Sequence, residues 1–168
     1  MLVTQRLTRL CWRGARADSV AYMNAHAAGP AHTPKPKSAK DAGWDVGVRE
    51  TVPVALPGVW KFLLGPGLPL WLGETTLAPT KGARYETHDG VSGEVKSYTE
   101  NSTIKLTWKP DDWPHVTQLR VTVKETVLGT TIAINHDLLA DREERRMMLG
   151  HWKNVIADIV HAIDQRAK

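Results

Sequence analysis

The last stretch of the chain, residues 141–168, constrains the fold more than any other part of the sequence. Its apolar residues recur at three- and four-residue spacing, which predicts one apolar stripe along a single long helix. The stripe consists of Met148, Leu149, Trp152, Val155, Ile156, Ile159 and Ile163. Asp141 is suited to the N-cap, and Glu144 follows at the capping-box spacing. Because such a stripe must be buried, the rest of the chain has to provide a surface that covers it.

Most segments before this helix have the two-residue period of half-buried β-strands. Ile104, Leu106 and Trp108 alternate with polar neighbours, and residues 116–127 repeat the pattern. Weaker alternation predicts further strands over residues 44–53, 83–88, 91–98 and, after a turn at Gly129, 130–139. The dipeptide Asp89-Gly90 predicts a two-residue hairpin turn between two of them. The sequence therefore predicts an antiparallel α+β domain that ends with the long helix.

Two short helices are predicted after the first strand. Pro57 is suited to the first turn of a helix, and its apolar face would consist of Val59, Trp60, Leu63 and Leu64. The glycines and prolines that follow end this helix, and a second short turn is expected around Trp71.

Charge is unevenly distributed along the chain. Residues 1–40 contain seven basic residues and one acidic residue, a net charge of +6, whereas the whole chain has +4. The remainder is therefore slightly acidic, so the basic character of the whole chain is no sign of a nucleic-acid partner. We predict that residues 1–40 form a basic, largely flexible arm and that residues 41–168 form one domain.

The single cysteine, Cys11, excludes an internal disulfide and favours a cytoplasmic location. No apolar run approaches the roughly 20 residues that span a bilayer, so no integral membrane contact is expected. His26 and His32 lack neighbouring metal-ligand types, and no zinc spacing or phosphate-binding loop occurs elsewhere. We therefore expect neither a metal ion nor a cofactor.

Candidate catalytic residues are few. His136 is predicted on an inward strand face near Glu125, and His151 beside Trp152, which leaves an acid–base pair open as an alternative. Structural histidines with satisfied hydrogen bonds are the favoured interpretation. No Ser-His-Asp order is present. We assign no catalytic residue, and an enzyme is the less favoured interpretation.

Several short motifs occur in an order that resembles a known family. They are Pro57, Val59 and Trp60; Trp71 to Gly73; Gly82 with Tyr85; Gly93 to Val95; Ile104, Leu106 and Trp108; Gly129 with Thr130; His136; and Trp152. Over residues 44–166 this order resembles the SRPBCC or START-like superfamily, and within it the domain named for activators of the heat-shock protein 90 ATPase. The resemblance implies a helix-grip fold, in which a curved antiparallel sheet of six or seven strands wraps around the C-terminal helix and an apolar cavity.

Twelve residues are expected to line that cavity. They are Trp60, Leu63, Trp71, Tyr85, Val95, Trp108, Leu119, Val121, Ile134, His136, Trp152 and Ile156. A mostly apolar lining selects a ligand by shape and hydrophobicity and offers no bond-breaking groups. We therefore predict non-catalytic binding of a small hydrophobic or amphipathic molecule. Two alternatives stay open, namely a protein-interaction or stress-related, co-chaperone-like module with a filled cavity, and an enzyme of the cyclase or aromatase type. A homodimer or another protein partner is also open.

Overall fold

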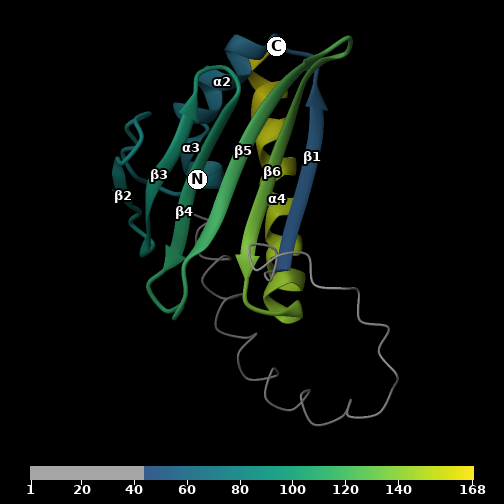
Figure 1. Cartoon of the computed structure of the whole chain (residues 1–168). Helices are drawn as coiled ribbons and strands as arrows, with labels where there is room; N and C mark the ends of the chain where they lie inside the picture. Colours follow the sequence, from purple (N-terminus) through teal and green to yellow (C-terminus); the bar gives the residue numbers. More distant parts are fainter. Residues whose placement is uncertain (1–43) are drawn as a thin grey trace, which may run out of the picture. The chain divides into compact units, whose positions relative to one another are not determined.

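The computed structural model describes residues 44–168 of the chain (Figure 1). Its elements, in chain order, are β1 (Trp44–Val52), α2 (Leu56–Leu64), α3 (Leu68–Trp71), β2 (Arg84–Glu86), β3 (Val91–Thr99), β4 (Thr103–Pro110), β5 (Thr117–Thr126), β6 (Gly129–Leu139) and α4 (Arg142–Arg166). The predicted N-terminal arm, with Cys11, His26 and His32, lies outside the described residues.

The six strands form one antiparallel sheet in the order β1-β6-β5-β4-β3-β2. Buried and half-buried residues alternate along β4, β5 and β6, so one face of the sheet belongs to the core. In Figure 1, α4 runs along one face of this sheet, next to β1 and β6. Helices α2 and α3 lie on the same face. The predicted α+β helix-grip fold, with two short helices after the first strand, is confirmed.

Helix α4 begins where the sequence predicts. The Asp141 carboxylate accepts a 2.8 Å hydrogen bond from the Glu144 backbone N–H, and the Glu144 side chain accepts one of 2.8 Å from the Ala140 N–H. The predicted stripe is buried at Met148, Trp152, Val155, Ile156, Ile159 and Ile163. Leu149 is only half-buried, at the margin of the stripe. The caps therefore fix the start of the helix while the stripe fixes which side meets the sheet.

The turn at Asp89-Gly90 differs from its prediction. Thr87 N–H donates to Val91 O at 2.7 Å, so the closed loop contains three residues rather than two. Gly90 has a φ of +86°, the left-handed conformation required at the last position of a three-residue hairpin loop. The glycine thus serves a longer turn than the dipeptide alone indicates.

The predicted boundary of the domain can be tested by shortening the chain. Residues Trp44–Lys168 form a compact unit with their own sheet, helix and core. We expect residues 41–168 alone to be soluble and to melt cooperatively, within about 4 °C of the full chain, because a 1 kcal/mol difference shifts the melting temperature of such a domain by about that much. An insoluble product, or loss of the cooperative transition, would contradict the boundary.

Candidate ligand-binding site

All twelve residues predicted to line a cavity are buried in the core, and none is more than 5% exposed. Cross-strand pairing brings several of them together, since Leu119 lies opposite His136 and Val121 opposite Ile134. The α4 side chains Trp152 and Ile156 are buried as well, and the Trp152 ring lies 6.3 Å from that of Trp108. The sequence therefore identified positions of one continuous core between sheet and helix.

The polar groups of this core are satisfied by the protein itself. The Tyr85 hydroxyl donates to the Thr107 carbonyl at 2.6 Å, and burial raises the pKa of Tyr85. Trp71 Nε1–H donates to the Leu63 carbonyl at 2.8 Å, and Trp60 Nε1–H contacts the Tyr98 hydroxyl at 3.3 Å. In the described part of the chain, no buried side-chain nitrogen or oxygen lacks a partner. These groups hold the core together instead of pointing at a vacant site.

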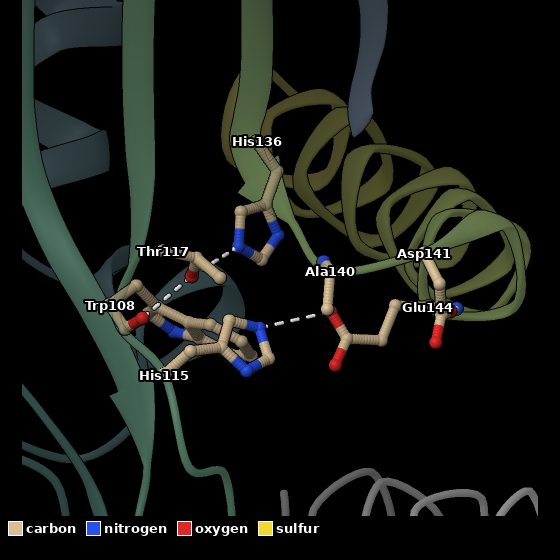
Figure 2. Close-up of polar contacts among 7 residues, drawn as sticks. All are labelled: Trp108, His115, Thr117, His136, Ala140, Asp141 and Glu144. Atoms are coloured by element: carbon tan, nitrogen blue, oxygen red, sulfur yellow. Dashed lines mark hydrogen bonds and ion pairs between the residues drawn. The ribbon is translucent and has the colours of Figure 1, made fainter. Parts of the chain in front are cut away.

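His136 occupies the middle of a chain of hydrogen bonds, of which Figure 2 draws the part from His136 through Thr117 to Trp108. Trp152 Nε1–H donates to His136 Nδ1 at 3.0 Å, His136 Nε2 lies 2.7 Å from Thr117 Oγ1, and Thr117 donates to the Trp108 carbonyl at 2.6 Å. Because indole N–H can only donate, Nδ1 must accept, and because the Thr117 proton is used on Trp108, His136 Nε2 must carry a proton. The contacts therefore require neutral His136 with its proton on Nε2.

Burial is the main cause of the low basicity of His136. Together with weaker electrostatic effects of His151 and His115, it lowers the pKa of His136 to about 3. His151 lies edge-on against Trp152 with ring centroids 4.7 Å apart, and burial lowers its pKa to about 4. Both rings are therefore neutral at physiological pH, and both nitrogens of His136 are used in hydrogen bonds within the core.

The predicted proximity of Glu125 to His136 is wrong. In the β5–β6 register Glu125 lies opposite Thr130, six residues along β5 from Leu119, which faces His136. At about 3.3 Å per residue this separates the two positions by roughly 20 Å. The Glu125 side chain is also exposed. The alternating pattern gave the correct face of His136 but not its position along the neighbouring strand.

Sequence reasoning missed an aromatic contact in the loop between β4 and β5. Trp113 is 5% exposed and meets Trp108 edge-on, with ring centroids 5.6 Å apart. His115 stacks on Trp113 at 5.0 Å, and its Nε2 lies 3.1 Å from Glu144 Oε2 (Figure 2). The loop is thus tied to the first turn of α4. A tryptophan inside an otherwise polar loop was the available signal.

The first of two hollows lies between α2 and the last turns of α4, and we call it the α2–α4 hollow. It has a volume of about 280 Å³. Its lining consists of Val54, Gly58, Val59, Lys61, Phe62, Pro66, Ile163, Arg166 and Ala167. Gly58 helps to keep it open, because a Cβ atom there would meet only Val54 Cγ1, at 3.6 Å. The floor is apolar, and the two charged residues are both basic.

The second hollow, the β1–α4 groove, lies between residues 47–50 of β1 and the side of α4. It has a volume of about 770 Å³ and includes both signs of charge, with Arg49 and Lys153 against Glu50 and Asp164. Of the twelve predicted residues, only Ile156 lines either of these two hollows. The openings therefore lie at the borders of the predicted core.

Two further features bear on the class of site. Within residues 44–168, no three His, Cys, Asp or Glu side chains gather so as to hold a metal ion. No helix in this range is long and apolar enough to cross a membrane.

Comparison with known proteins identifies the family. The model of the "Activator of Hsp90 ATPase homolog 1-like protein" family matches residues 57–164. The chain belongs to this family. The match extends from α2 almost to the end of α4, and it leaves out three residues that line the α2–α4 hollow, Val54, Arg166 and Ala167. No curated protein matches the chain.

Solved structures share the fold at low sequence identity. Protein MLL2253 from Mesorhizobium loti has a TM-score of 0.63 and 19% identity, over 73% of this chain and 98% of that one. CalU16 from Micromonospora echinospora has a TM-score of 0.63 and 14% identity, over 71% and 73%. The Aha1 dimer from Colwellia psychrerythraea has a TM-score of 0.60 and 12% identity, over 71% and 95%. At these identities the likeness establishes the shared fold alone.

Proposed function

We propose that this domain binds a small hydrophobic or amphipathic molecule and does not change it chemically. The observation that carries the proposal is the α2–α4 hollow, an open and mostly apolar concavity with two polar residues at its rim. Ligand sites in proteins have this character, with an apolar lining and a few polar groups that orient the ligand. Its volume of about 280 Å³ is close to the lower end of such sites, about 300 Å³.

The predicted core residues extend the same proposal inward. Trp60 and Leu63 belong to α2, as do Val59 and Phe62 in the lining of the hollow. That the twelve residues line a cavity stays a prediction, and we propose the hollow as its entrance.

The residues at hand support binding over turnover. The lining of the α2–α4 hollow contains no His, Cys, Ser, Asp or Glu side chain, so it offers no acid–base pair. His136 uses both ring nitrogens in hydrogen bonds within the core. A homodimer, as in the Colwellia structure, remains compatible with this function and is a separate prediction.

Filling the hollow should weaken binding. We expect Gly58→Leu to lower the affinity for apolar and amphipathic compounds at least about tenfold, because the added side chain occupies the space next to Val54. Titration of a panel of such compounds, followed by calorimetry or fluorescence, measures the effect. Ile134→Trp, which adds volume in the core, tests whether the ligand also reaches the interior.

Gly150→Leu is the matched control. Gly150 is also a helical glycine, it is exposed, and a Cβ atom there meets nothing within 4 Å. The same substitution there changes helix propensity without filling the hollow. Binding that is equal in both variants, or absent from the unaltered protein across the panel, would contradict the proposed function. Thermal melts of each variant establish that the protein is folded.

A further inference from the structure

We propose that the α2–α4 hollow selects an anionic amphiphile with a single tail, whose head group lies between Lys61 and Arg166. This inference rests on the proposed function and names its ligand class. The apolar tail lies on the floor formed by Val59, Phe62 and Ile163. The head group is a carboxylate, sulfate or phosphate monoester, because these anions accept hydrogen bonds from ammonium and guanidinium groups.

The first support is the charge of the rim. Lys61 comes from the last turn of α2 and Arg166 from the last turn of α4. No acidic residue lines the hollow, and no carboxylate of residues 44–168 forms an ion pair with either cation. Two like charges beside one concavity repel each other, and an anion bound between them adds two attractions that offset this repulsion.

The second support is the position of Arg166. Its guanidinium lies over the Phe62 ring, 5.2 Å from the ring centroid, which is a cation–π contact on the floor of the hollow. The helix dipole explains a cation in the last turn of either helix. The dipole does not explain why the Arg166 guanidinium lies over the Phe62 ring. In this position its positive charge would be next to a ligand bound in the hollow.

The size of the hollow limits the ligand to one tail. A volume of about 280 Å³ leaves no room for a lipid with two long chains, since drug-sized sites extend to about 1,000 Å³. The larger β1–α4 groove does not compete as an anion site, because Glu50 and Asp164 line it together with its basic residues. Charge and volume thus both assign the anion to the smaller hollow.

The test compares three compounds that share a decyl chain and differ in head group. They are decyl sulfate, the neutral decyl maltoside and the cationic decyltrimethylammonium, each titrated as monomers into the full chain at low ionic strength. We expect decyl sulfate to bind about tenfold more tightly than the maltoside, and the cation to bind most weakly. Each exposed ion pair with the head group should raise the affinity about two- to fivefold. Added salt should reduce the preference for decyl sulfate over the maltoside.

Variants then assign the preference to residues. Lys61→Gln and Arg166→Gln should each lower the affinity for decyl sulfate about two- to fivefold and leave the maltoside unchanged. Arg166→Lys keeps the charge and should keep most of the preference. Arg142→Gln, an exposed cation in the first turn of α4, is the matched control and should have no effect.

The outcomes separate this inference from the function beneath it. If decyl sulfate and the maltoside bind equally, or if Lys61→Gln and Arg166→Gln behave like Arg142→Gln, the anionic head-group site is wrong while ligand binding stands. If none of the three compounds binds, both proposals fail. Because Lys61 and Arg166 are exposed, their variants should melt like the unaltered protein, so a changed affinity reports on the ligand.

Discussion

Replacing Trp152 with alanine is expected to lower the free energy of unfolding by about 3–5 kcal/mol. Trp152 is fully buried at the middle of α4, with its ring edge-on to His136 at 5.8 Å. Alanine would leave a large cavity at the centre of the domain. It would also remove the N–H group that donates to His136 Nδ1. Urea denaturation of the two proteins measures the difference.

Trp152→Phe separates the two contributions. Phenylalanine keeps most of the aromatic packing but has no N–H group, so His136 Nδ1 loses its donor. The cost of that loss alone is about 1–3 kcal/mol, the usual penalty for an unsatisfied buried polar group. A Trp152→Ala protein as stable as the unaltered one would show that α4 does not pack as described.

Acidification should destabilise the domain through His136. Its pKa is about 3 in the folded protein and about 6.5 in the unfolded chain. Between these values the unfolded chain binds a proton that the folded protein does not, so stability falls as the pH falls below about 6.5. The slope from His136 is half of its limit at pH 6.5 and approaches about 1.4 kcal/mol per pH unit below it, which amounts to about 1.6 kcal/mol between pH 6.5 and 5. The lowered pKa of His151 acts in the same direction.

Two measurements check this expectation. In His136→Gln, which cannot titrate, the free energy of unfolding should depend less on pH between 7.5 and 5 than in the unaltered protein. Independently, the His136 ring signals in NMR spectra should stay those of a neutral imidazole down to about pH 4.5. A ring that becomes protonated near pH 6.5 in the folded state would disprove the hydrogen-bond assignment from Trp152 to Trp108.

The parts of the fold that were predicted are those with local signals. The stripe of α4 and its Asp141–Glu144 cap are encoded within the helix itself, and the structure has both. The alternation through Ile104 to Trp108 likewise fixed which residues of β4 face the core. A repeat of two residues in a strand, or of 3.6 in a helix, shows which face is buried even when the element packed against that face is unknown.

The candidate site depended on information that no local pattern contains. The position of Glu125 relative to His136 depends on the register of β5 against β6, whereas periodicity fixes only faces. Lys61 and Arg166 are distant in the sequence and line one hollow only because α2 lies near the end of α4. Each was recognisable as an exposed cation near a helix end, but their shared hollow appears only after the helices are placed.

The pairing of β1 with β6 has a consequence for synthesis on the ribosome. Val52 ends β1, yet its partner Thr130 lies about eighty residues later in the chain, and α4, which also packs on β1, is later still. At roughly 5–20 residues per second, β1 is translated several seconds before the segments that cover it. The nascent strand therefore has to be kept from pairing with neighbouring chains during this interval. The charged pair Arg49-Glu50 within β1 is suited to keeping the unpaired strand soluble until β6 has been synthesised.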